Sequence, residues 1–388
     1  MRNGSSIESA AYDGRLLSEW GDVVVITVNH RLNTIGFLDL SSFGEKYEGS
    51  ANAGLLDLAA ALQWIHTNIA NFGGDPDNVT IFGQSGGGSK CTALMRMPSA
   101  IELFDNVGVI SGGATTIQDN SSSARVGELT VELLGLTAET VDEIQTLPYD
   151  TVLAASNEAL ELAKAEEGFT AYSFGPVADG KYIMSDFLDL TGKNVVVSQC
   201  FSESAFASYK AENGDGRHNE WSDEESLEWI KLRYGEKSEA MLEEFRKLFP
   251  EKSDANLYFY NIGGYTSIKN KSAAFASAGA TVYDYMFNYE APTNGGTTAF
   301  HCVDLIYLFH NVDDPRCAIA TGANEDAHRI QDQLAGAFVN MMYNGTPSTD
   351  ELPWTPYAEG ECNLMKFDVE SGCVTFDDSE LMAIYNAE

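Results

Sequence analysis

The sequence predicts an α/β fold with a mostly parallel central sheet flanked by helices. Two observations support this class. Short β-branched runs typical of buried strands alternate with helix-like segments, and a glycine-rich turn joins one such run directly to a helix. The chain has 388 residues, of which 44% are hydrophobic, so it can bury a substantial core. We expect a single domain over residues 1–388.

The strands are predicted from five runs, four of them rich in β-branched residues and the last in aromatic ones. They are Asp22–Val28, Val79–Phe82, Val107–Ile110, Val195–Val197 and Thr281–Phe287. A helix is expected over 55–70, where Leu55, Leu58, Leu62, Ile65 and Ile69 recur at helical spacing. A second helix is expected over 89–97, directly after the glycine-rich turn.

Two longer segments, 115–175 and 211–275, have the pattern of helices with acidic faces. The second contains an acidic loop at 212–226. Because both lie between predicted strands, we expect helical, cap-like insertions over the active-site end of the sheet rather than separate folding units.

Charge excludes several classes of partner. The formal net charge is −35, so nucleic acids and anionic membrane surfaces would repel the chain, and the charge itself is best explained by solubility. The first residues carry no apolar signal-peptide core, and no apolar run is long enough to span a membrane. We therefore expect a cytoplasmic location, with a secreted longer form as the alternative.

The cysteines and histidines do not indicate a metal site. The six cysteines are scattered, with no CxxC pair and no Cys/His cluster at zinc-ligand spacing. We expect free thiols and no metal or cofactor, with a Cys362–Cys373 disulfide as the alternative.

The candidate nucleophile lies in VTIFGQSGGGSK, residues 79–90, which contains a G-x-S-x-G match centred on Ser85. A strand before the motif and a helix after it would hold the serine hydroxyl on a sharp, exposed turn. The backbone N–H of Gly86 would then face the reacting carbonyl as an oxyanion donor. The alternatives are a structural glycine-rich turn or a phosphate-binding loop, but the spacing to Lys90 misses the phosphate-loop pattern by one position.

Longer stretches resemble the type-B carboxylesterases, the family of bacterial nitrobenzyl esterases and cholinesterases, which have the α/β-hydrolase fold. The matching text includes NAGLLDLAAALQWIHTNIANFGGDPDNVTIFGQSGGG at 52–88, DVVVITVNHRLNTIGFL at 22–38, GVISGG at 108–113 and AGAFVNMMYNGTPSTDELPWTPY at 335–357. This resemblance covers nearly the whole chain.

The resemblance implies a Ser-Glu-His triad. NVVVSQCFSESAFASY at 194–209 makes Glu203 the matching acid, and AFHCVDLIYLFHN at 299–311 makes His301 the base, with His310 as the nearest rival. Ser111 resembles a family serine near the triad acid; it could support that acid or simply end a strand. His30 and His66 are interpreted as packing or surface residues.

Two features depart from the family pattern. Gln84 stands beside the nucleophile where many members have Glu, which predicts a weaker preference for cationic esters. The chain begins at MRNGSS, which looks like the text just after the family's H-G-G-G oxyanion string. A misassigned start, a truncated chain and a natural short form all remain open, and the activity of a shortened chain is in question.

We therefore expect a carboxylic-ester hydrolase that acts on small to medium neutral esters through an acyl-enzyme intermediate. One alternative is a non-catalytic cholinesterase-like interaction protein or an inactive truncated form. Another is an enzyme of the same fold that cleaves amides or carbamates.

Overall fold

A six-stranded sheet forms the centre of the computed structural model, which describes residues 9–203, 218–293, 295–357 and 363–387. The strand order is β1-β2-β5-β6-β7-β8; all neighbours run parallel except the last pair. The strands are β1 (Thr80–Gln84), β2 (Asn106–Ile110), β5 (Asn194–Cys200), β6 (Thr281–Phe287), β7 (Asn363–Phe367) and β8 (Gly372–Thr375). The prediction of a mostly parallel sheet is confirmed.

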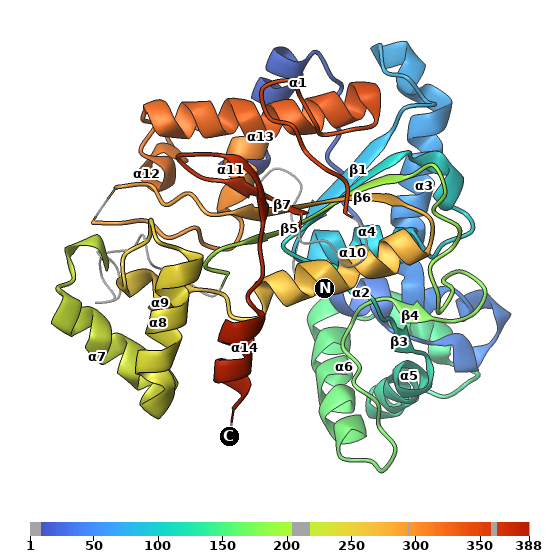
Figure 1. The fold of residues 1–388 in the computed structure, drawn as a ribbon. Coiled ribbons are helices and arrows are strands. Elements are labelled where there is room, and N and C mark those ends of the chain that lie inside the picture. The colour runs from blue at the N-terminus through green and yellow to red at the C-terminus, as the bar shows by residue number, and fades with distance from the viewer. Residues whose placement is uncertain (1–8, 204–217, 294, 358–362, 388) are drawn as a thin grey trace.

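Helices cover both faces of this sheet (Figure 1). α1 (Arg15–Gly21), α11 (Val303–Leu308) and α13 (Glu325–Asn344) lie on one side, and α10 (Gly264–Ser277) packs against β5 and β6 on the other. The remaining helices near the sheet are α2 (Asn33–Phe37), α3 (Ala53–Asn68), α4 (Gly86–Leu94), α12 (Ala318–Thr321) and α14 (Ser379–Asn386). The central strands are buried because both faces are covered, and all five residues of β2 are inaccessible to solvent.

The predicted strand at Asp22–Val28 is wrong. This segment is extended but forms no strand, and Val24 and Ile26 are 44% and 41% exposed. A β-branched run becomes a strand only where a neighbouring strand takes up its backbone hydrogen bonds. None of the described residues pairs with this segment as a strand, so its side chains remain partly exposed. The other four predicted strands are confirmed within a few residues at their ends.

The sequence pattern missed β7 and β8, which extend the sheet beyond β6. Their sequences, NLMKF and GCVT, are short and mix polar with apolar residues, so neither has a clear period. Pairing of β7 with β6 places Phe287 beside Phe367 and completes that side of the sheet.

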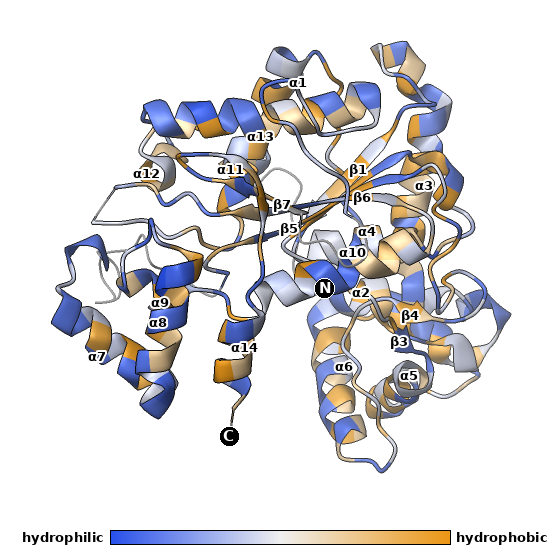
Figure 2. Cartoon of the chain, in the orientation of Figure 1, coloured by the Kyte–Doolittle hydropathy of each residue, from blue (hydrophilic) through white to orange (hydrophobic). Residues whose placement is uncertain are grey.

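The two insertions leave the sheet at the carboxyl ends of β2 and β5. The first contains α5 (Ser121–Leu133), α6 (Tyr149–Lys164) and the short parallel pair β3 (Gln118–Asp119) and β4 (Val177–Ala178). The second contains α7 (Asp223–Tyr234), α8 (Ser238–Leu248) and α9 (Ala255–Phe259), and ends before α10, which belongs to the layer over the sheet. Hydrophilic and hydrophobic residues alternate around α6 and α8, as expected of helices with one buried face (Figure 2). Residues 212–217 of the predicted acidic loop lie outside the described residues, and Asp223–Glu225, near its end, form the first turn of α7 rather than a loop.

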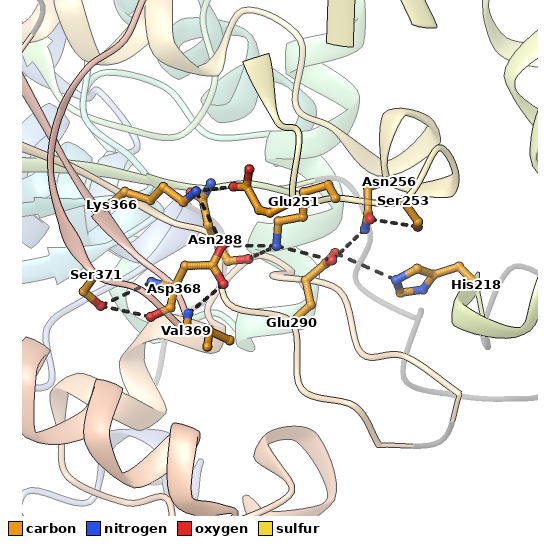
Figure 3. Close-up of polar contacts among 11 residues, drawn as sticks. His218, Glu251, Ser253, Asn256, Asn288, Glu290, Lys366, Asp368, Val369 and Ser371 are labelled. Atoms are coloured by element: carbon orange, nitrogen blue, oxygen red, sulfur yellow. Dashed lines mark hydrogen bonds and ion pairs between the residues drawn. The ribbon is translucent and has the colours of Figure 1, made fainter. Parts of the chain in front are cut away.

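A buried charge network joins the second insertion to the carboxyl ends of β6 and β7 (Figure 3). The Lys252 ammonium lies 3.5 Å from Glu290 and 3.3 Å from Asp368, and donates to the Asn288 carbonyl at 2.7 Å. Burial opposes the charge of Lys252, but the two carboxylates outweigh burial and raise its pKa. Because β6 is followed by the loop that leads to His301, this network anchors the start of that loop.

Candidate active site

Ser85 occupies the sharp turn between β1 and α4. Its backbone has φ 56° and ψ −116°, a conformation that costs a non-glycine residue about 1–3 kcal/mol. The turn is fixed from both sides, because the Ser85 N–H donates to Ile110 at 2.8 Å and its carbonyl accepts from the Ser89 N–H at 3.1 Å. The strained turn expected from the motif is therefore present.

Glycines make this turn sterically feasible. A Cβ at Gly83 would lie 2.4 Å from the backbone of Gly87, and a Cβ at Gly112 would lie 2.1 Å from the carbonyl oxygen of Ser85. Both contacts are with backbone atoms, which cannot rotate away. A Cβ at Gly86 would meet no atom within 4 Å beyond its chain neighbours and the backbone of its own helix, so there is open space beside this residue.

Backbone pairing brings Glu203 and His301 together although they are 98 residues apart in the chain. Beyond β5, Ser202 forms a parallel bridge with Phe300, and its N–H donates to the Ala299 carbonyl at 2.9 Å. Glu203 directly follows Ser202, and His301 directly follows Phe300, so the bridge brings the two residues together. Nδ1 of His301 is hydrogen-bonded to Oε2 of Glu203, and the two side chains are only 14% and 13% exposed.

Further contacts position the acid and the imidazole. The Cys200 N–H donates to Oε1 of Glu203 at 2.7 Å, which orients the carboxylate. Nε2 of Gln84 lies 3.0 Å from Nε2 and 3.2 Å from Nδ1 of His301, so the amide sits beside the ring. Since Nδ1 is engaged by Glu203, the imidazole nitrogen available to the Gln84 amide is Nε2.

The electrostatics of the pair favour a charged imidazole. Burial lowers the pKa of His301, but hydrogen bonds to Cys302 and Glu203 and the Glu203 charge outweigh burial and raise it to about 10. Cys302 has φ 79° and precedes α11. This thiol beside the imidazole was not singled out in the sequence, because only folding shows which side chains face the ring.

Ser85, Gly86, Gln84 and His301 line one cavity of about 810 Å³. The cavity extends along the outer edge of β1 and beneath residues 22–32. The structure therefore brings the predicted nucleophile, oxyanion donor and base to one space, with Glu203 behind the base.

Ser111 lies near this group but does not touch the acid directly. Its hydroxyl donates to the Cys200 thiol at 3.8 Å, and the N–H of the same cysteine contacts Glu203. Asp304 is a buried carboxylic acid that the sequence analysis did not single out. It accepts from the Tyr285 hydroxyl at 2.9 Å, and burial together with the Glu203 charge raises its pKa to about 6.

The rival histidine is placed elsewhere. His310 pairs with Asp332 at 2.9 Å and stacks on Trp20, with ring centroids 4.5 Å apart. His66 is exposed, as expected, whereas His30 lines the cavity.

Within the described ranges, no group of three or more His, Cys, Asp or Glu side chains could hold a metal ion. The described cysteines at 91, 200, 302, 317 and 373 are free, and Cys362 lies outside the described residues. Among the helices that the structure describes, none is long and apolar enough to cross a membrane.

A parallel sheet covered by helices, with a strained serine between a strand and the following helix, defines the α/β-hydrolase fold. Residues 2–380 match the model of the carboxylesterase family. The para-nitrobenzyl esterase of Bacillus subtilis (strain 168) is 28% identical over 92% of this chain and 72% of its own length. Human neuroligin-3 is 33% identical over 48% of this chain and 21% of its own length.

Among solved structures, an esterase from the anaerobe Clostridium hathewayi, described as able to hydrolyze aliphatic aromatic polyesters, superposes with a TM-score of 0.87. It is 34% identical, and the match covers 99% of this chain and 76% of that one. A thermophilic PNB esterase matches with a TM-score of 0.72 and 28% identity over 99% of this chain and 79% of that one. The chain belongs to the carboxylesterase family, in its type-B branch, and is a carboxylesterase.

Proposed function

We propose that this carboxylesterase cleaves small to medium esters with Ser85 as nucleophile, His301 as general base and acid, and Glu203 as the orienting carboxylate. The hydrogen bond between Nδ1 of His301 and Glu203 is the single observation that carries this assignment. It leaves Nε2 as the nitrogen that would take the Ser85 proton in place of its contact with the Gln84 amide, and Ser85 and His301 line the same cavity.

In the proposed reaction, Ser85 attacks the ester carbonyl as Nε2 of His301 takes the hydroxyl proton. The N–H of Gly86 stabilises the oxyanion at the start of α4. His301 then protonates the leaving alcohol, and an acyl-enzyme remains. Water attacks this intermediate by the same route and releases the acid. The raised pKa of His301 reflects the stabilised imidazolium that forms at each step.

A fluorophosphonate probe tests the assignment, because it reacts with an activated serine. We expect labelling of the wild-type chain, none of Ser85→Ala, and strongly reduced labelling of His301→Ala. Labelling that persists in Ser85→Ala would refute the nucleophile. A properly folded wild-type chain that fails to label and to hydrolyse p-nitrophenyl butyrate would favour the non-catalytic alternative.

The two insertions complete the proposal as cap-like segments over the site. Both begin at carboxyl ends of strands, the same edge of the sheet on which Ser85 and Glu203 lie. Their helices would then determine which acyl and alcohol groups reach the serine.

A further inference from the structure

Lys90 places a positive charge in the cavity that contains Ser85. It lies in α4, one turn after Gly86, and residues four apart share a helix face. Both residues line the cavity, and the rise of the helix separates them by about 6 Å along its axis. The ammonium group therefore lies on the same side of α4 as the proposed oxyanion donor.

No counter-charge for this lysine is found in the part of the chain that the structure describes. Lys90 is half-buried, yet among the hydrogen bonds and ion pairs of the described residues none involves its ammonium. Burial accordingly lowers its pKa. The chain has 58 acidic residues and only 23 lysines and arginines, so carboxylates are plentiful elsewhere. The buried Lys252, by contrast, has two carboxylates within 3.5 Å.

His30 is a second polar group in the same cavity. Nδ1 of His30 lies 2.8 Å from the Arg31 carbonyl, an acceptor, so Nδ1 carries a proton and Nε2 is the second ring nitrogen. After burial, the Lys90 charge is the strongest influence that lowers the pKa of His30. Asp57 acts in the opposite direction, but it is engaged by Arg31, with the closest atoms 2.6 Å apart. Burial and the Lys90 charge favour the neutral form of His30, whose Nε2 is then an acceptor, so the group here with which an anion can pair is Lys90.

We propose that Lys90 binds a carboxylate of the substrate, so that this site prefers esters that carry a free carboxylate a short spacer from the scissile bond. The inference rests on the proposed function, because the subsite shares the Ser85 cavity, and it replaces the neutral esters expected from the sequence. The overall charge of −35 does not oppose it strongly. Distant carboxylates are screened beyond about 8 Å at physiological salt, whereas Lys90 would touch the substrate.

The carboxylate could belong to the acyl or to the alcohol part, and two matched ester pairs separate these cases. Mono-4-nitrophenyl adipate and 4-nitrophenyl methyl adipate differ only by a charge on the acyl side. For the alcohol side, 4-carboxyphenyl butyrate is compared with 4-(methoxycarbonyl)phenyl butyrate. In each pair, the quantity measured is the ratio of kcat/KM for the acid to that for its neutral methyl ester.

We expect wild-type protein to give a ratio above one in at least one pair. In that pair Lys90→Met should lower the ratio about 10- to 100-fold, the value of one hydrogen bond to a charged group. Methionine keeps the apolar stem, so packing is preserved, and Lys90→Arg should retain most of the ratio. Lys231→Met, at an exposed position of α7, is the control and should leave the ratio unchanged.

Direct binding tests the subsite independently of turnover. Calorimetry with Ser85→Ala should show monomethyl adipate binding at least 10-fold more tightly than dimethyl adipate, and adding Lys90→Met should remove the difference. If Lys90→Met does not fold, Lys90→Gln replaces it. Equal ratios in both ester pairs, or equal binding of the two adipates, overturn the subsite. Loss of all hydrolysis with preserved selective binding would instead overturn the proposed reaction.

Discussion

The substitution Gly112→Ala tests whether the position of Ser85 depends on close backbone packing. Gly112 does not have a positive φ, so alanine meets no backbone strain there, only a steric contact. The added Cβ would lie 2.1 Å from the carbonyl oxygen of Ser85 and 2.9 Å from its Cα. Ordinary contacts of this kind are at least about 3 Å, so the two backbones must separate by roughly 1 Å.

A displacement of this size reaches Ser85, the proposed nucleophile. Misplacing a reacting group by about 1 Å can cost on the order of 100-fold in rate, so kcat/KM for p-nitrophenyl butyrate should fall by about that factor. Overpacking should also destabilise the fold by about 1–3 kcal/mol, measured as a lower urea midpoint with an unchanged m-value. The rate of fluorophosphonate labelling should fall in parallel with kcat/KM.

Gly372→Ala is the control, because a Cβ at that position in β8 meets no atom within 4 Å. It should leave the labelling rate and the urea midpoint close to those of the wild type. If Gly112→Ala also retained full activity and an unchanged midpoint, the claim that glycine is required to place Ser85 would be wrong.

Three further substitutions test the electrostatics. Gln84→Glu adds a carboxylate beside His301. It should improve the preference for a choline ester over its uncharged isostere by up to about 5-fold, which corresponds to about 1 kcal/mol for a partly exposed ion pair. An unchanged preference would refute the expectation that the neutral amide at position 84 weakens the preference for cationic esters. In the proposed reaction the neutral imidazole of His301 is the active base, so activity should fall as pH drops through its raised pKa. Glu203→Gln removes one cause of that raised pKa, and the acid limb of kcat/KM should move to lower pH while the rate falls about 10³–10⁴-fold; a limb that stays in place would contradict the pairing. Lys252→Met removes the closest ammonium from two buried carboxylates and should cost about 3–5 kcal/mol in urea unfolding, whereas Lys366→Met, at a more exposed edge of the network, should cost clearly less; equal losses would show that burial does not set the cost.

Local patterns predicted the parts of the site that depend on neighbours in sequence. The alternation of strand and helix signals gave four strands of the sheet, and the serine turn could be placed because its glycines lie within a few residues of Ser85. The pattern failed at Asp22–Val28 for the same reason, since it reports side-chain preference and not the presence of a pairing partner. Glu203 and His301 came from the resemblance, because nothing local distinguishes either residue from an ordinary polar side chain.

Tertiary structure decided everything that depends on the distance between segments remote in the chain. The bridge between Ser202 and Phe300 brings Glu203 beside His301, and Gly112 fits against the Ser85 turn only because β2 lies beside β1. The same holds for Lys90, an ordinary helical lysine in the sequence, because only the folded chain shows that no described carboxylate pairs with it. Hydrogen bonds, burial and charge pairing act over a few ångströms in space, and sequence separation does not record that distance. Local sequence patterns were therefore enough to predict the fold class and the proposed nucleophile, and the fold determined what surrounds Ser85.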